Sequence, residues 1–282
     1  MRLIWADFCL DFVRKTSVMG ILNVTPDSFS EGGTYFDRDA AIRYGLEMVE
    51  NGADIIDIGG ESTRPGAEPL DLDEELRRTI PVIETLAKRV RVPISIDTYK
   101  AEVAKKALDA GASMVNDISG LRFDAEMPKV VARHEVPVVI MHIKGTPRDM
   151  QKNPVYEALI PEIIDYLRAG IRLAMGAGVK EERIILDPGI GFGKTFDENL
   201  EILKNLQEFT GLQRPILVGP SRKAFIGKIL GDAPASDRIE GTAAAVAISI
   251  LNGADIVRVH DVKEISKVVR VADAIKRGRI RG

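Results

Sequence analysis

Residues 18–33 read VMGILNVTPDSFSEGG, and this stretch decides how the rest of the chain is interpreted. Its first five residues are apolar enough for a strand buried on both faces, and the run stops at Asn23. A polar loop follows, with Pro26 in its turn and two glycines near its end. Because a buried amide without a partner costs about 1–3 kcal/mol, Asn23 indicates a partner outside the core, such as a ligand.

The same arrangement of an aliphatic strand, a polar strand end and a helix recurs along the whole chain. Further strands are expected at 54–60, 94–97, 113–117, 138–142, 183–187, 216–219 and 255–260. Helices are expected near 39–51, 73–89, 100–109, 125–134, 155–177, 197–208, 223–230, 236–252 and 262–276. Pro93, Pro137 and Pro215 each stand where a strand begins, a position that needs no ladder donor.

Strands and helices that alternate in units of ~30 residues predict a (β/α)8 TIM barrel, here as a single domain over residues 1–282. An open doubly wound sheet would leave apolar edge strands, and the even spacing contains no obvious switch point. Residues 3–13 alternate loosely. We expect them to form a short β segment that covers the bottom of the barrel.

Composition restricts the classes of partner. Hydrophobic residues make up 45% and charged residues 29% of the chain, and the net charge is −3. These values are typical of a globular protein with a sizeable core and argue against nucleic-acid or membrane partners. Cys9 is the single cysteine, which excludes an intramolecular disulfide framework, and the N-terminus lacks a signal-peptide layout. We therefore expect a cytoplasmic protein.

The residues that follow barrel strands converge on one face, where barrel enzymes carry their chemistry. Polar residues stand at every expected strand end: Asn23, Thr63, Arg64, Asp97, Asn116, His142, Asp187, Lys223, Arg258 and His260. Any one of them alone is more often a helix cap, a turn former or a satisfied structural histidine. Their joint occurrence predicts a functional pocket.

Two kinds of chemistry are present in this set. Arg64, Lys223, Arg258 and His260 are cationic or can become so, which suits a diphosphate, and Asn23 could supply an oxygen to Mg²⁺. The remaining carboxylates and amide suit a heterocycle with several N–H donors, since an ionised carboxylate only accepts. The sequence therefore predicts a substrate with a polar flat ring at one end and a diphosphate at the other.

The sequence 193–195, Gly-Lys-Thr, has the ending of a phosphate-binding Walker A loop but is not one. Pro188 stands where the first glycine of that motif belongs. The Gly-x-Gly at 189–191 lacks the third glycine of a dinucleotide-binding motif, because Lys194 occupies its place.

The chain resembles the dihydropteroate synthase family from about residue 17 to 278. The resemblance is carried by MGILNVTPDSFSEGG (19–33), DIGGESTRPGA (57–67), SIDT (95–98), VNDISG (115–120), MHIKGTPRDMQ (141–151), DPGIGFGK (187–194), GPSRKAFIG (219–227) and RVHDV (258–262). It implies that 7,8-dihydropterin-6-ylmethyl diphosphate condenses with 4-aminobenzoate in folate biosynthesis, giving 7,8-dihydropteroate and pyrophosphate. It also implies a Mg²⁺ cofactor and a homodimer.

The resemblance assigns roles residue by residue. The catalytic residues would be Asp97, Lys223 and Arg64, and Asn23 would hold the metal. Asp97, Asn116 and Asp187 would hold the pterin, with Met141 and Lys223 lining its pocket. The diphosphate would be held by Asn23, Arg64, Arg258 and His260. The aminobenzoate site would be shaped by Thr63, Pro65, Phe192 and Lys223, and Gly219 would also bind substrate. Two residues depart from the family pattern: Ala224 stands where many members have Ser, and Glu31 replaces the commoner Asp.

Two other functions remain open at this point. A methyltransferase acting on a methyltetrahydrofolate shares the fold but would need neither residues 63–65 nor the loop at 24–33. A non-catalytic pterin-binding protein would explain Asp97, Asn116 and Asp187 but not the cationic set. The stretch 241–251, GTAAAVAISIL, is expected to pack in the core or at a dimer contact.

Overall fold

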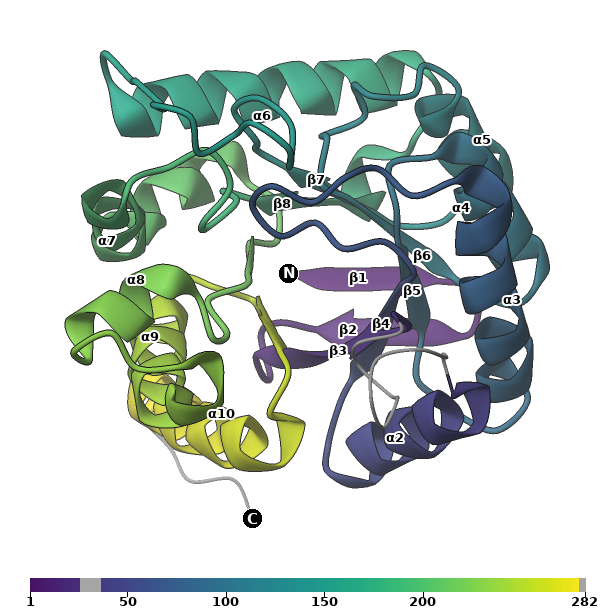
Figure 1. Cartoon of the computed structure of the whole chain (residues 1–282), viewed down its shortest axis with the longest axis horizontal. Coiled ribbons are helices and arrows are strands. Elements are labelled where there is room, and N and C mark those ends of the chain that lie inside the picture. Colours follow the sequence, from purple (N-terminus) through teal and green to yellow (C-terminus); the bar gives the residue numbers. More distant parts are fainter. Residues whose placement is uncertain (26–36, 279–282) are drawn as a thin grey trace.

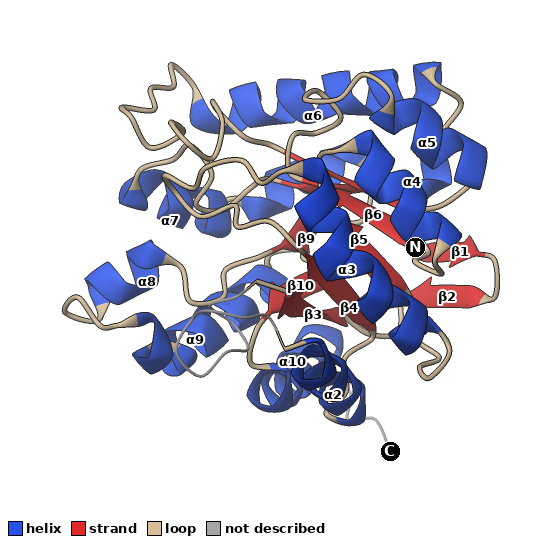
Figure 2. Ribbon diagram, turned by 45° about the vertical axis from the view of Figure 1, so that its right-hand side comes forward, coloured by secondary structure: helices blue, strands red, loops and turns tan. Residues whose placement is uncertain are grey.

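The computed structural model describes residues 1–25 and 37–278, and its centre is a barrel of parallel strands surrounded by helices (Figures 1 and 2). The strands are β3 (Ser17–Asn23), β4 (Ile55–Gly59), β5 (Ile94–Asp97), β6 (Met114–Asp117), β7 (Val138–Met141), β8 (Ile184–Asp187), β9 (Leu217–Val218) and β10 (Ile256–Val259). Their order is β8-β7-β6-β5-β4-β3-β10-β9. A single bridge between Leu186 and Ile216 joins the two ends of this sheet. The predicted TIM barrel is confirmed.

The helices of the described residues alternate with these strands as expected. They are α2 (Arg38–Glu50), α3 (Leu72–Ala87), α4 (Ala101–Asp109), α5 (Met127–His134), α6 (Leu159–Gly176), α7 (Phe196–Lys204), α8 (Ala224–Ile229), α9 (Ile239–Leu251) and α10 (Val262–Arg277). Helix α7 ends before its expected end at 208, and a 3-10 helix, Leu206–Leu212, follows it. In the part of the chain described here, no helix combines the length and apolarity that a membrane span requires.

Alternate residues of each strand face opposite sides of the barrel wall, as the pleat requires. The outward residues pack beneath the helices, as Ile56 and Ile58 do on β4. The inward residues form a separate cluster at the lower end of the barrel, which includes Met19, Ile55, Met114, Val139, Ile185, Leu217 and Ile256. The strands are buried on both faces, which explains why they read as continuous apolar runs.

A two-stranded hairpin closes the lower end of the barrel. It is formed by β1 (Arg2–Trp5) and β2 (Phe8–Asp11), which pair antiparallel and lie across the barrel opening in Figure 1. Leu3, Trp5, Leu10 and Phe12 join the inward cluster. Nε1 of Trp5 donates to the backbone oxygen of Ser113 at 2.8 Å, so the indole is satisfied where it is buried. This confirms the expected N-terminal cover.

The two ends of the chain are bound to one another. The backbone N and Oγ1 of Thr16 both donate to the Asp273 carboxylate on α10, each at 2.8 Å. Arg277 on the same helix pairs with Asp273 and donates to the backbone oxygen of Phe12 at 3.2 Å. The first strand of the barrel, β3, therefore starts from a point fixed by the last helix.

Candidate active site

A group of strand residues points into the barrel above the inward apolar cluster. Each lies two positions after a residue of that cluster on its own strand and therefore shares its side of the wall. They are Asp57, Asn116, Met141, Asp187 and Arg258; Gly219 has the same spacing from Leu217 but comes one residue after the end of β9. The polar residues among them come from four different strands, so one opening of the barrel collects side chains spread over two hundred positions of sequence.

Arg258 lies between two carboxylates at the centre of this opening. Its Nε donates to Oδ2 of Asp57 at 2.6 Å, and one terminal nitrogen donates to Oδ2 of Asp97 at 2.5 Å. Nδ2 of Asn116 donates to the same Asp57 oxygen at 3.0 Å. The Asp57 side chain is fully buried. These contacts hold three of the predicted site residues in one network.

The pKa values of Asp97 and Arg258 are both raised in this network. Burial raises the pKa of Asp97 to about 7, with Arg258 opposing the rise and the Asp57 charge adding to it. The pKa of Arg258 also rises, because the attraction of Asp57 and Asp97 outweighs the cost of burying its charge. Arg258 is therefore a permanent cation, whereas Asp97 changes charge near neutral pH.

Asp187 and Lys223 also lie in the opening and interact electrostatically. Burial raises the pKa of Asp187 to about 6, although its Oδ1 accepts the Gly189 amide at 2.7 Å and Lys223 lies near enough to oppose the rise. Burial and the charge of Arg258 lower the pKa of Lys223 to about 8. The Lys223 ammonium also lies over the Phe192 ring, 4.4 Å from its centroid. The structure thus brings Asp187, Lys223 and Phe192 together as predicted.

The loop after β8 is fixed by a buried lysine. Nζ of Lys194 donates to the backbone oxygens of Gly189 and Phe192, each at 2.8 Å, and lies 2.9 Å from Nδ1 of His142. Gly189 has φ +72°, and a Cβ there would lie 1.9 Å from the His142 oxygen. The rejection of a Walker A loop is consistent with this arrangement, because the lysine faces the protein interior and holds the Phe192 loop.

An apolar cluster lies beside the polar network. Met141, Ile118, Ile143, Met150 and Phe192 are buried together, apart from the main core. Met141 pairs in register with Asp187 across β7 and β8. A flat ring that bonds to the Asp187 carboxylate would therefore lie against sulfur and aliphatic carbon. Gly219 lies beside Arg258, where a Cβ would make an ordinary contact at 3.8 Å from Cβ of Arg258.

His260 follows β10 and is held on two sides. Its Nδ1 lies 3.0 Å from Oγ of Ser221, and its backbone oxygen accepts the Tyr44 hydroxyl at 3.1 Å. Burial, together with Arg222 and Arg258, lowers the pKa of His260 to about 3. At pH 7 the His260 ring is therefore neutral. Any contact with a diphosphate would use a neutral N–H donor and not the imidazolium cation considered from the sequence.

Asn23 ends β3 in the same row of paired residues as Gly59 on β4 and Asp97 on β5. It is half-buried and supplies one amide oxygen at the rim. Among residues 1–25 and 37–278 there is no group of three His, Cys, Asp or Glu that could hold a metal ion. The Asn23 oxygen alone fits a Mg²⁺ ion that keeps several of its waters and is held chiefly by phosphate oxygens of the substrate.

The loop at 61–70 carries Thr63, Arg64 and Pro65 and extends over the barrel mouth in Figure 1. Its Gly66 amide donates to the Pro147 oxygen in the loop after β7 at 2.9 Å. Arg64 is exposed, and across the described residues no ion pair holds its guanidinium. Residues 61–70 therefore reach the mouth without joining the Arg258 network.

One of the two departures from the family pattern, Ala224, lies at the edge of this site. Ala224 is the first residue of α8 and is exposed, next to Lys223 at the helix N-cap. Glu31 lies outside the described residues.

Sequence reasoning missed the part played by Asp57, Ser221 and Lys194. Asp57 lies inside the apolar run DIIDIGG, and a charge in the middle of a strand buried on both faces was the available signal. Ser221 was interpreted as a turn or cap residue, and Lys194 as part of a false phosphate motif. Each has a partner far away in the sequence, which local patterns do not reveal.

The chain is similar to known proteins over nearly its whole length. The family model described as pterin binding enzyme matches residues 19–260. A dihydropteroate synthase of Synechocystis sp. is 52% identical over 267 residues, which cover 95% of this chain and 92% of that protein. The crystal structure of Yersinia pestis dihydropteroate synthase with a sulfonamide drug has a TM-score of 0.93 and 41% identity, covering 98% of this chain and 100% of that one.

A Xanthomonas albilineans dihydropteroate synthase in complex with 7,8-dihydropteroate has a TM-score of 0.88 and 39% identity, covering 98% and 99% of the two chains. The match extends over the strand ends that carry the site, from Asn23 to His260. The chain therefore belongs to the dihydropteroate synthases, within the family of pterin-binding enzymes.

Proposed function

We infer that the chain condenses 7,8-dihydropterin-6-ylmethyl diphosphate with 4-aminobenzoate, giving 7,8-dihydropteroate and pyrophosphate. The observation that carries this function is the gathering of Asp97, Asn116 and Asp187 with Lys223 and Arg258 in one barrel mouth. The first three supply acceptors and one amide for a polar ring, and the last two supply positive charge for a diphosphate. A simple pterin-binding protein would not need the cations.

The pterin would bind in the inner part of the mouth. Asp187 and Asn116 would meet its N–H groups and ring acceptors, and Asp97 would lie beside the carbon that becomes electron-poor. The buried cluster that contains Met141 would cover one face of the ring. Gly219 would lie beside the ring.

The diphosphate would lie toward the rim. Arg258 would remain charged throughout the reaction, and the neutral His260 would donate one N–H. We propose that the Asn23 oxygen contributes to a Mg²⁺ held mainly by the diphosphate. When bound, the metal would neutralise the charge that builds up on the leaving group.

The reaction breaks the bond between the methylene carbon and the diphosphate oxygen and forms a bond from that carbon to the amine nitrogen. An aromatic amine is neutral at pH 7 and already nucleophilic, so no side chain needs to be activated as a nucleophile. The amine loses one proton after the bond forms. Expelling the diphosphate is the difficult step, and fixed cations stabilise its charge without rearrangement.

The second substrate would bind between the 61–70 loop and the wall made by Phe192 and Lys223. Thr63 and Pro65 would shape this place, and Arg64 would close over it. A closed loop would exclude water, which could otherwise capture the electron-poor carbon. Lys223 would serve both halves of the site, since its ammonium lies over the Phe192 ring and interacts electrostatically with Asp187.

We also propose a homodimer formed through α9 and α10. These helices pack against one another, and both expose aliphatic side chains: Ile248 and Leu251 on α9, Val271 and Ile275 on α10. Exposed aliphatic groups in close succession are typical of protein contact surfaces. The stretch at 241–251 also buries Val246 and Ile250, so it contributes to the core as well. A cytoplasmic location stays a prediction.

The test of the function is release of pyrophosphate from the two substrates with Mg²⁺ present. Release should require both substrates and should fall when Mg²⁺ is chelated. Binding of the pterin diphosphate with no pyrophosphate formed would favour a binding protein instead. Transfer of a methyl group from methyltetrahydrofolate to a corrinoid protein would favour the methyltransferase alternative.

A further inference from the structure

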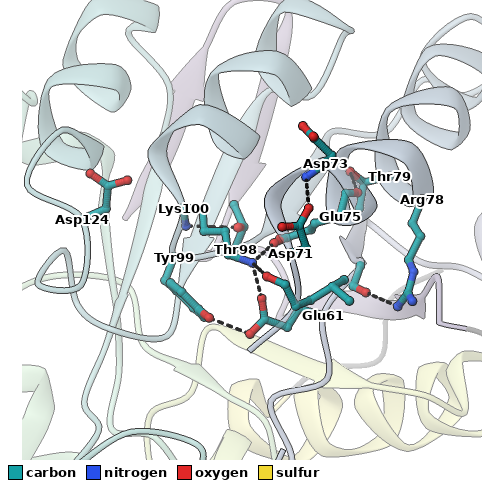
Figure 3. Close-up of polar contacts among 12 residues, drawn as sticks. Glu61, Asp71, Asp73, Glu75, Arg78, Thr79, Thr98, Tyr99, Lys100 and Asp124 are labelled. Atoms are coloured by element: carbon teal, nitrogen blue, oxygen red, sulfur yellow. Dashed lines mark hydrogen bonds and ion pairs between the residues drawn. The ribbon is translucent and has the colours of Figure 1, made fainter. Parts of the chain in front are cut away.

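The loop at 61–70 has both of its ends bound by one ammonium group. Nζ of Lys100 donates to Oε2 of Glu61 at 2.5 Å and to the backbone oxygen of Leu70 at 2.6 Å. A third bond, also 2.6 Å, runs to Oε2 of Glu75 on α3. An ammonium has three N–H donors, and this arrangement uses all of them. Figure 3 shows Lys100 directed at both carboxylates.

These charges are largely removed from water. The exposed fraction of the side chain is 19% for Lys100, 8% for Glu61 and 1% for Glu75. Burial opposes the charged form of Lys100, but its bonds to Glu61 and Glu75 outweigh that effect and raise its pKa. Lys100 is therefore charged at neutral pH, and removing it would leave two buried carboxylates without their cation.

The base of the loop is fixed more firmly than its tip. Oε1 of Glu61 accepts the Tyr99 hydroxyl at 2.6 Å, so both oxygens of this carboxylate are held (Figure 3). The preceding Gly60 oxygen accepts Arg78 at 3.0 Å. Residues 63–65, which lie between the base and the Gly66 contact, are exposed or half-buried. The loop is therefore held at its base by buried side chains, and at its tip by the Gly66 bond to Pro147 and the exposed pair of Glu68 with Arg148.

Lys100 also lies three residues after Asp97, at the N-cap of α4. Asp97, which we assign to the pterin, ends β5, and the chain continues from it through residues 98 and 99 to Lys100, which binds the 61–70 loop. Lys100 is thus close in sequence to the pterin site, although the partners of its ammonium all lie in the 61–70 loop and on α3.

We propose that Lys100 is a positioning residue for the second substrate, acting by fixing both ends of the loop that carries residues 63–65. This inference rests on the proposed function, which assigns that loop to 4-aminobenzoate. Lys100 touches neither substrate. Loss of Lys100 would leave the pterin site intact but would allow the 61–70 loop to occupy several positions. Binding of 4-aminobenzoate would therefore weaken, and binding of the pterin diphosphate would not.

The test uses Lys100→Met and Glu61→Gln in the full chain, with KM measured for each substrate. In Lys100→Met we expect KM for 4-aminobenzoate to rise about tenfold or more and KM for the pterin diphosphate to stay within about twofold. Glu61→Gln leaves one cation facing one carboxylate, so it folds without an unpaired buried charge and should raise the same KM about threefold. Hydrogen exchange of the 61–70 amides should quicken in both variants.

Lys105→Met is the matched control, because it lies on the same helix and pairs with Asp109 at the surface. It should alter neither KM nor the exchange of the loop. The proposal is overturned if both KM values stay at the wild-type level in Glu61→Gln, or if they rise together in either variant. A wild-type chain that releases no pyrophosphate would instead refute the proposed function, independently of Lys100.

Discussion

Replacing Asp57 with alanine removes the carboxylate that two other site residues use. Its Oδ2 accepts Nε of Arg258 at 2.6 Å and Nδ2 of Asn116 at 3.0 Å, and the side chain is fully buried. Removing one partner of a buried ion pair costs about 3–5 kcal/mol. Because Arg258 keeps its second carboxylate, Asp97, we expect the lower end, a loss of about 3 kcal/mol in the free energy of unfolding.

The assay is urea unfolding at pH 8, where Asp97 is ionised, together with binding of the pterin diphosphate to the folded variant. Without Asp57, Nε of Arg258 has lost its carboxylate partner and only the bond to Asp97 remains, so the affinity for the pterin diphosphate should fall about tenfold. Asp165→Ala is the control, because this carboxylate pairs with Arg168 at the surface, 74% exposed. It should change the free energy of unfolding by less than about 0.5 kcal/mol.

An Asp57→Ala variant within about 1 kcal/mol of the wild type, with unchanged pterin affinity, would refute this reasoning. It would mean that Asp97 alone holds Arg258 in place. Asp57→Asn separates the two contributions, since it keeps the volume and one acceptor but not the charge. We expect Asp57→Asn to lower the free energy of unfolding, but by less than Asp57→Ala does.

Other predictions follow from individual contacts. Burial raises the pKa of Asp187 from its ordinary value of 3.8 to about 6 in the folded protein. Folding therefore favours the protonated carboxyl group. This contribution to the free energy of unfolding, up to about 3 kcal/mol, is fully present below pH 3.8 and is lost as the pH rises through 6. Asp187→Asn should lose pterin affinity, and in urea titrations its free energy of unfolding relative to the wild type should increase from pH 4 to pH 8. A difference from the wild type that does not change with pH would contradict the assignment. Gly189→Ala places a Cβ 1.9 Å from the His142 oxygen and should destabilise by about 3 kcal/mol or more in thermal unfolding. Trp5→Ala should cost about 3–5 kcal/mol by the same measurement, and a loss under 1 kcal/mol would mean that the barrel bottom closes without the indole. Arg64→Ala should chiefly lower kcat in the pyrophosphate assay, and unaltered kinetics would mean that its loop does not close over the site.

The barrel could be predicted because its signals are local and repeat. Each strand is an apolar run with a polar end, and each helix shows its own spacing, so strand number and order follow from the chain alone. Helix ends were less accurate. The helix expected from 155 begins at Leu159, because the Glu162 carboxylate accepts the amides of Glu157 and Ala158 and caps the helix there.

The charges within the site could be predicted only in part. Arg258 and Asp97 stand at strand ends and were expected, but their ion pair spans 161 positions of sequence. Asp57 contacts Arg258 across 201 positions; its charge inside an apolar strand marks it as unusual, but no local pattern shows which residue is its partner. The neutral state of His260 also depends on burial and on neighbouring cations, which exist only after folding.

The closure of the barrel has a consequence for how the polypeptide acquires its structure during synthesis. Strand β3 lies between β4 and β10, and Thr16 at its start is tied to Asp273 on α10. When a ribosome has released the first half of the chain, β3 has only one of its two neighbours and its anchor has not been translated. This strand keeps one edge unpaired until β10 and α10 have also been synthesised, so nascent-chain chaperones have an exposed strand edge to protect during that interval.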